Sequence, residues 1–185
     1  MQRDIARNDD VQPTPDASSL HDALEKCSRL TWKVDTMWPM QLACFLAVFS
    51  SENTKKRMIV VQPRGGGKTH VIRVIGSMLR AITLLIHPLL TLTGDQVGRF
   101  LEGSDVYGSM EAHNLDKQGS FNPGFQYKLL KRLRRVQNNT TSTIFLFVSL
   151  QYLATNSGVQ EELLRCSRRG TLRSVQLDKA HLYAQ

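Results

Sequence analysis

Residues 65–69, which read Gly-Gly-Gly-Lys-Thr, constrain the fold and chemistry of this 185-residue chain more than any other segment. Consecutive glycines allow the backbone to approach a ligand closely and to turn several N–H groups toward it. An apolar run at 58–61 predicts a short buried strand before the segment, and apolar residues at helical spacing over 71–79 predict a helix behind it. A glycine loop that leads from a strand into a helix N-terminus is typical of a phosphate-binding site.

The wider segment from Gln62 to Thr69 resembles the Walker-type phosphate loop, G-x-x-x-x-G-K-[ST], except that Gln62 stands at the first glycine position. Lys68 supplies a point charge for the outer phosphates of a nucleotide, and Thr69 supplies a hydroxyl suited to Mg²⁺. The alternative is a glycine-rich turn with an accidental Lys-Thr pair, which the flanking elements disfavour. We therefore predict nucleotide binding by Gln62, Pro63, Arg64, Gly65, Gly66, Gly67, Lys68 and Thr69.

Strand and helix patterns alternate along the chain. Apolar runs predict strands at 58–61, 82–86, 106–108, 143–148 and 172–177, and residue spacing predicts helices at 19–34, from Pro39, and at 71–79, 92–101, 125–136 and 159–168. This alternation predicts an α/β domain over 19–185, with a parallel sheet covered by helices on both faces, behind a disordered polar tail at 1–18. Ligands bind at the carboxyl ends of such strands, where the glycine loop and Asp178 both fall.

The net charge of +8 is concentrated in the last third of the chain. Residues 1–122 carry 14 basic and 13 acidic side chains, whereas residues 123–185 carry 10 basic and 3 acidic ones. A one-sided basic excess suits a polyanion such as nucleic acid. The alternative is a solvated basic face without a partner, and the charge alone does not decide between the two.

Composition also bears on the compartment. The sequence has neither an apolar run of about 18 residues nor an apolar signal core near Met1, so we expect an intracellular protein without a membrane span. Its three cysteines, Cys27, Cys44 and Cys166, show no Cys-x-x-Cys pairing. Structural zinc is therefore not expected, and reduced thiols fit an intracellular protein.

Four segments together resemble the first RecA-like domain of superfamily 2 DNA helicases, nearest the RecQ group with its DEAD/DEAH-type motifs. Residues 37–41, Met-Trp-Pro-Met-Gln, look like the family's aromatic-x-x-Gln element, and 62–69 look like motif I. Residues 87–97, His-Pro-Leu-Leu-Thr-Leu-Thr-Gly-Asp-Gln-Val, are similar to motif Ia, and 177–181, Leu-Asp-Lys-Ala-His, resemble the Walker B box. The resemblance runs from about Trp38 to His181.

The resemblance implies ATP and Mg²⁺ as cofactors and single-stranded DNA as the nucleic-acid partner. Gln41 would read the adenine edge, because an amide both donates and accepts hydrogen bonds. Asp178, together with Thr69, would hold Mg²⁺, and Lys68 and Asp178 would act in catalysis. His181 would couple the nucleotide to the nucleic acid. Pro88, Leu89, Thr91 and Gln96 would lie against the DNA backbone, where such contacts position the strand without reading its sequence.

Three features depart from the family pattern. Lys179 stands where the family has the glutamate that polarises the attacking water, and a cationic side chain cannot act as that base. Only Ser149 remains of the family's Thr/Ser-Pro-Glu step, which puts a strand contact there in doubt. The sequence ends at Gln185, soon after the Walker B box, so a second RecA-like domain would have to come from another chain. A sheet that ends there is expected to leave its last strand under-covered and the protein marginally soluble.

Three functions follow from these residues. The first is a helicase-derived ATP-binding and nucleic-acid-binding domain with impaired hydrolysis, from a fragment or a decayed copy, nuclear if the source is eukaryotic. The second is an active ATP-dependent helicase subunit that another chain completes. The third is a non-enzymatic nucleic-acid-binding module that uses the basic residues of 128–135 and 165–173.

Overall fold

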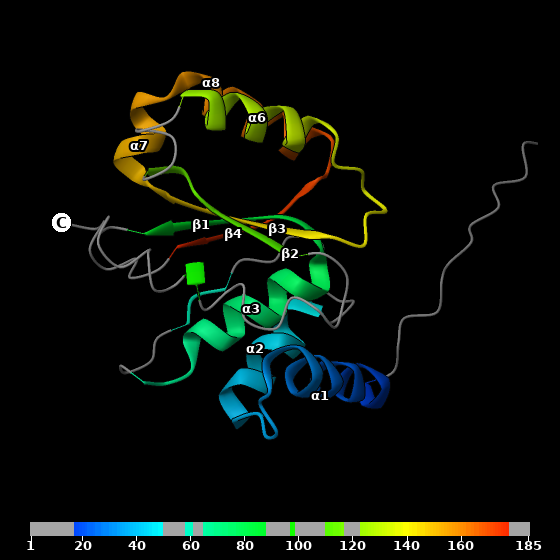
Figure 1. Ribbon diagram of the computed structural model, residues 1–185. Coiled ribbons are helices and arrows are strands. Elements are labelled where there is room, and N and C mark those ends of the chain that lie inside the picture. The colour runs from blue at the N-terminus through cyan, green and yellow to red at the C-terminus, as the bar shows by residue number, and fades with distance from the viewer. Residues whose placement is uncertain are drawn as a thin grey trace, which may run out of the picture.

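A parallel four-stranded sheet lies between two layers of helices in the computed structural model (Figure 1). The structure describes residues 17–49, 58–60, 65–87, 97–98, 110–116 and 123–177. The strands are β1 (Ala81–His87), β2 (Met110–Asn114), β3 (Thr143–Ser149) and β4 (Leu172–Leu177), in the spatial order β2-β3-β1-β4. All three neighbouring pairs are parallel.

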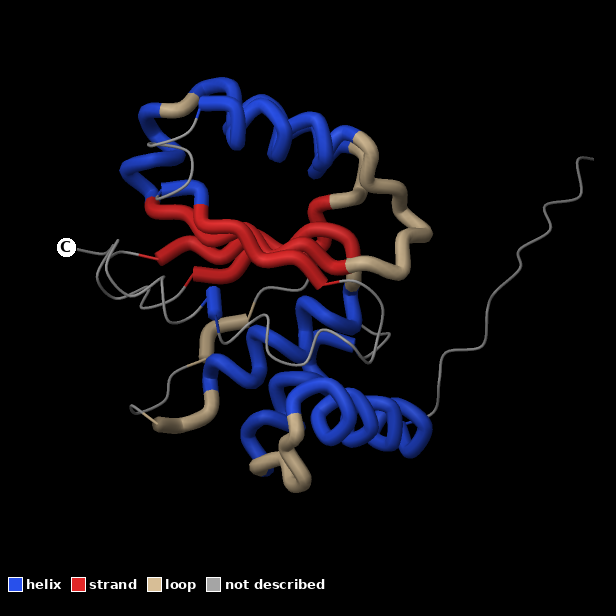
Figure 2. The backbone as a smooth tube through the Cα atoms, in the orientation of Figure 1, coloured by secondary structure: helices blue, strands red, loops and turns tan. Residues whose placement is uncertain are grey.

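Helices cover both faces of this sheet, as the sequence predicts. One layer contains α1 (Ala17–Trp32), α2 (Pro39–Phe49) and α3 (Lys68–Leu79), and the other contains α6 (Pro123–Arg134), α7 (Leu150–Thr155) and α8 (Ser157–Arg168). Figure 2 shows the strands in red between these two blue layers. The chain is therefore an α/β fold consistent with a RecA-like domain.

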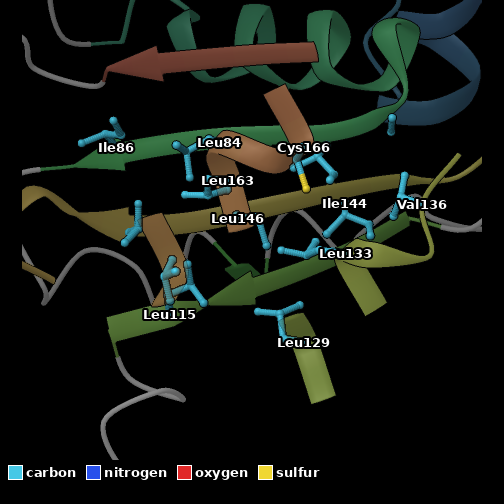
Figure 3. Close-up of a cluster of buried hydrophobic side chains, with 14 of the residues drawn as sticks. Leu84, Ile86, Leu115, Leu129, Leu133, Val136, Ile144, Leu146, Leu163 and Cys166 are labelled. Carbon is cyan, nitrogen blue, oxygen red and sulfur yellow. The ribbon is translucent and has the colours of Figure 1, made fainter. Parts of the chain in front are cut away.

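The two central strands carry the core. Every residue of β1 and of β3 is buried, as expected for apolar strands that helices cover on both sides. Alternate residues of the strands serve two hydrophobic clusters, one beneath each helical layer. Figure 3 shows the cluster under α6 and α8, in which Leu133, Leu163 and Cys166 pack over Ile144 and Leu146.

Most of the described elements match their predicted positions. The strands predicted at 82–86, 143–148 and 172–177 are confirmed as β1, β3 and β4, and α2 begins at Pro39 as predicted. Two elements escaped prediction. β2 is an edge strand whose three middle residues are only half-buried, so its apolar signal is weak. α7 has six residues, too few to show a helical period. Ser149 caps its N-terminus, since the serine hydroxyl accepts a hydrogen bond from Tyr152 N.

The strand predicted at 58–61 is wrong for the part that the structure describes. Residues 58–60 belong to no strand, and Ile59 is 90% exposed. Val60 alone packs against the cluster beneath α1–α3. A short apolar run indicates burial only if a strand edge pairs with it, and the described strands give 58–60 no such partner.

The fourth strand lies at the edge of the sheet. Its residues alternate between half-buried and exposed, and Val175 and Leu177 are 52% and 51% exposed. This exposure agrees with the expectation of an under-covered last strand, while the expected low solubility stays a prediction. The predicted strand at 106–108 and most of the predicted helix at 92–101 lie outside the described residues.

None of the helices within the described ranges is long and apolar enough to cross a membrane.

A glycine allows α3 to pack closely on the sheet. A Cβ on Gly76 would collide with Cε1 of Phe145, would lie 2.8 Å from Cζ of the same ring, and would lie 3.1 Å from Oγ1 of Thr83. Phe145 and Thr83 are fully buried in β3 and β1, so neither side chain has room to move. The distance between the helix and the sheet is therefore set at Gly76.

We predict that Gly76→Ala lowers the free energy of unfolding by about 1–3 kcal/mol, because it overpacks this contact. Gly158→Ala is the matched control. Gly158 lies in α8, and an added Cβ there meets nothing within 4 Å. This control should be neutral or stabilising by up to about 1 kcal/mol. Urea titrations of both variants test the difference, and equal effects would contradict the packing argument.

Candidate nucleotide and nucleic-acid site

The glycine loop ends at the first turn of α3. Gly65 and Gly67 adopt φ values of 79° and 72°, a left-handed conformation that favours glycine. The carbonyl of Gly67 accepts hydrogen bonds from His70 N at 3.0 Å and from Val71 N at 3.3 Å, and no side chain caps this end of the helix. The N-terminal N–H groups of α3 thus carry the partial positive charge that attracts anions.

Gln41 of α2 lies against this loop. Its Oε1 accepts a hydrogen bond from Trp38 N at 2.8 Å, and its Nε2 donates to the carbonyl of Gly67 at 3.4 Å. The side chain is only 4% exposed, and a Cβ on Gly67 would collide with Nε2. The fold therefore brings together Gln41 and Gly67, which are 26 residues apart in the sequence.

Part of the predicted nucleotide site is described. Lys68 is half-buried and Thr69 is exposed in the first turn of α3. Figure 1 shows that this end of α3 lies on the side of the molecule where the strands end, as expected for a ligand site in a parallel sheet. β4 ends at Leu177, the residue before Asp178.

Several predicted site residues lie outside the described part of the chain. They are Gln62, Pro63 and Arg64 of the loop, Pro88, Leu89, Thr91 and Gln96 of the DNA-contacting segment, and Asp178, Lys179 and His181 of the Walker B box. Their roles stay predictions.

A buried polar network joins the carboxyl ends of three strands. Asp116, just beyond β2, accepts hydrogen bonds from Ser149 N at 2.8 Å and from Ser149 Oγ at 2.6 Å. Nε2 of His87, the last residue of β1, lies 3.5 Å from Oδ2 of Asp116. All three residues are nearly inaccessible to solvent. The network fixes the point at which the chain leaves β1 for the segment at 88–96.

The sequence did not predict this network, although His87 begins the segment that resembles motif Ia and Ser149 is the remnant of the Thr/Ser-Pro-Glu step. The serine hydroxyl donates to Asp116 and accepts from Tyr152 N at 3.1 Å, so both of its roles are engaged inside the protein. Burial and the nearby Asp116 charge also raise the pKa of Tyr152. The only sequence signal for Asp116 is its position just after a strand. That signal is weak, because the apolar pattern of β2 is itself weak.

Comparison with known proteins places these features in context. No family model matches the chain. A protein of Caenorhabditis briggsae named as an ATP-dependent DNA helicase Q1 is 23% identical over 155 residues, which cover 83% of this chain and 23% of that protein. The ATP-dependent DNA helicase Q-like 2 of Arabidopsis thaliana is 25% identical over 132 residues, which cover 71% of this chain and 17% of the relative.

The chain is distantly related to RecQ-like DNA helicases. The matches extend over most of this chain, and they agree with the resemblance that the four motif segments indicate. The chain spans less than a quarter of the length of either relative. The similarity therefore covers only one part of each of these longer relatives.

His70 anchors the helix behind the glycine loop. Its Nε2 lies 3.0 Å from Oγ of Ser28 in α1, and both side chains are buried. Burial, together with the positive charge of Arg73, lowers the pKa of His70 from 6.5 to about 4. The neutral imidazole is therefore the form that the folded protein accommodates.

We predict that stability falls as the pH decreases from about 6.5 to about 4. The unfolded chain binds a proton at His70 in this window and the folded chain does not, so His70 contributes a loss of up to about 3 kcal/mol. Urea titrations at several pH values should show a smaller loss for His70→Gln. His21→Gln, at a side chain that is 40% exposed, should keep the wild-type profile. Identical profiles for all three proteins would refute the assignment.

Proposed function

We propose that this chain is the ATP-binding and nucleic-acid-binding RecA-like domain of a RecQ-like DNA helicase, with impaired hydrolysis. The contact between Gln41 and Gly67 is the observation that carries the proposal. The resemblance assigns adenine recognition to Gln41 and phosphate binding to the loop, and the fold places these two groups side by side. The alternative, a glycine turn with an accidental Lys-Thr pair, does not explain this contact with Gln41.

The geometry of the glycine loop suits the phosphates of a nucleoside triphosphate. Two glycines adopt left-handed conformations, the first turn of α3 has no side-chain cap, and a side chain at Gly67 would collide with Gln41. Residues 62–69 would surround the phosphates, and Lys68 would neutralise their charge. Thr69 and Asp178 would hold Mg²⁺, which when bound further screens the phosphate oxygens.

Gln41 retains capacity for a base. One amide hydrogen of Nε2 and one lone pair of Oε1 are used by Gly67 and Trp38. An amide has a second hydrogen and a second lone pair, so it can donate to and accept from the adenine edge at the same time. The existing bonds hold the amide group in one orientation, which lowers the entropy cost of recognition.

Hydrolysis is expected to be weak because Lys179 follows Asp178 directly. A glutamate at this position would orient and polarise the attacking water, whereas a lysine ammonium cannot accept a proton at neutral pH. An active subunit completed by another chain is the second candidate, and Lys179 argues against it. The proposed complex thus holds ATP and DNA with little turnover.

Single-stranded DNA is the proposed nucleic-acid partner. The segment with Pro88, Leu89, Thr91 and Gln96 would lie along its backbone. The network of His87, Asp116 and Ser149 supports this role, because it anchors the residue from which the segment starts. Contacts of this kind position the DNA without reading its sequence.

We predict that Lys68→Ala weakens Mg-ATP binding by a factor of about 10 to 100, because a charge-assisted contact contributes about 1.5–3 kcal/mol. Isothermal titration calorimetry measures the affinity. Lys26→Ala, at an exposed lysine of α1, should bind ATP like the wild type. Unchanged affinity in Lys68→Ala would refute the phosphate-loop assignment.

Two glycine variants serve as a control for the loop geometry in the same assay. Gly65→Ala and Gly67→Ala both place a side chain at positive φ, but only the Cβ at Gly67 collides with Gln41. Gly67→Ala should therefore lose more affinity than Gly65→Ala. Equal losses would mean that Gln41 plays no part in shaping the site.

A second prediction concerns turnover. Phosphate release by the wild type should be slow even with saturating single-stranded DNA, and Lys179→Glu should raise it by restoring a carboxylate base. Lys179→Gln removes the positive charge without adding a base and should stay slow. Wild-type turnover equal to that of an active RecQ-like helicase, measured in parallel, would contradict impaired hydrolysis.

A further inference from the structure

A basic hollow lies on the helical layer remote from the glycine loop. It has a volume of about 330 Å³ and is lined by Arg134 of α6 and by Glu162, Arg165, Arg168 and Arg169 of α8 and the turn after it. We call it the arginine hollow. α6 and α8 end beside it, and Figure 1 shows that these ends lie on the side where the strands begin. The glycine loop lies on the other face of the sheet, near the ends of the strands.

One buried carboxylate organises the arginines. Glu162 is 1% exposed, and its Oε2 lies 2.7 Å from Arg134 Nε and 3.4 Å from Arg165 Nη1. Its Oε1 lies 3.7 Å from Arg169 Nη2. Arg169 also donates to the backbone carbonyls of Arg134 and Leu133, which ties the end of α8 to the end of α6. The guanidinium groups of Arg134, Arg165 and Arg169 are thus held in place before any ligand arrives.

The hollow keeps an excess of positive charge. Four arginines face Glu162 and Glu161, which pairs with Arg165 at 3.4 Å, so two positive charges remain unbalanced. Arg165 is 53% exposed, and Arg168 is exposed and makes no ion pair with any described residue. These two side chains can bind a ligand without releasing Glu162, which Arg134 and Arg169 would still hold.

Favourable placement at helix ends does not account for this arrangement. Basic residues in the last turn of a helix interact well with its negative end, and α6 and α8 both have them. That effect requires neither a buried carboxylate nor the meeting of two helix ends at one hollow. Preorganised guanidinium groups suit phosphate oxygens, which they contact through paired N–H donors.

The surrounding surface favours a polymeric anion over a single small one. Lys128, Lys131 and Arg135 are exposed and are spaced by three and four residues along α6 and its end, so they extend the positive surface beyond the hollow. We propose that the arginine hollow binds a backbone phosphate of nucleic acid, as a second contact separate from the segment at 88–96. The choice of nucleic acid rests on the proposed function, whereas ATP binding is not required.

The test compares two double variants of the full chain. Arg165→Gln with Arg168→Gln removes two charges from the hollow, and Lys26→Gln with Arg29→Gln removes two exposed charges from α1, in the opposite helical layer. Fluorescence anisotropy with a labelled oligothymidylate, at several salt concentrations, gives the affinity and its salt dependence. Melting temperatures confirm that both variants are folded.

We expect the hollow variant to bind about tenfold or more weakly. The slope of log K against log salt should also become shallower by about 0.7, since the hollow contacts one phosphate and each lost phosphate contact on a single strand removes about 0.7. The α1 variant should match the wild type. Equal losses in both variants would show an effect of net charge alone and would overturn the proposal.

Other outcomes separate this site from the proposed function. A wild type that fails to bind the oligonucleotide would overturn both, whereas binding that the hollow variant leaves unchanged would overturn the hollow alone. Polyglutamate provides the competitor. At equal charge concentration, polyglutamate could displace the oligonucleotide from the wild type but not from the hollow variant. That result would show that the hollow prefers carboxylates, and the assignment to phosphate would be wrong.

Discussion

The parallel pairing of β1 with β3 supports the rest of the structure. The two strands match residue for residue from Ala81 opposite Thr143 to His87 opposite Ser149, and every one of these fourteen positions is buried. Such a pair is stable only if helices cover both of its faces, because each strand presents apolar side chains on both sides. The helical layers, the close approach of α3 at Gly76 and the hydrophobic clusters all follow from this requirement.

The same pairing determines where chemistry can occur. His87 and Ser149 end their strands side by side, and Asp116 joins them from beyond β2. The start of α3 and its glycine loop lie on this side of the molecule, with Gln41 held against Gly67. The carboxyl side of the sheet thus has a rigid base, from which the proposed nucleotide and DNA contacts extend. The arginine hollow lies on the opposite side, and a nucleic acid bound at both places would have to cross the domain.

The distant relationship to RecQ-like helicases gives these features a common meaning without defining the activity. Identities of 23% and 25% preserve a fold and its loop positions more readily than catalytic details. Lys179 shows why the distinction matters. In the proposed function, one cationic side chain at the position of a general base would leave nucleotide binding intact and would remove the group that activates water. Binding and hydrolysis therefore have to be measured separately in this protein.

The sequence by itself determined the α/β class, three of the four described strands and the glycine loop at the start of α3, because these depend on local apolar spacing and on residues without a Cβ. It also placed Gln41 among the site residues, but only through resemblance. The tertiary structure decided what depends on partners distant in the chain. It left Ile59 exposed where an apolar run predicted a strand, and it added the edge strand β2. It also gathered Asp116 with His87 and Ser149, and four arginines around Glu162. Burial and charge compensation are properties of assembled elements, and no local pattern encodes them.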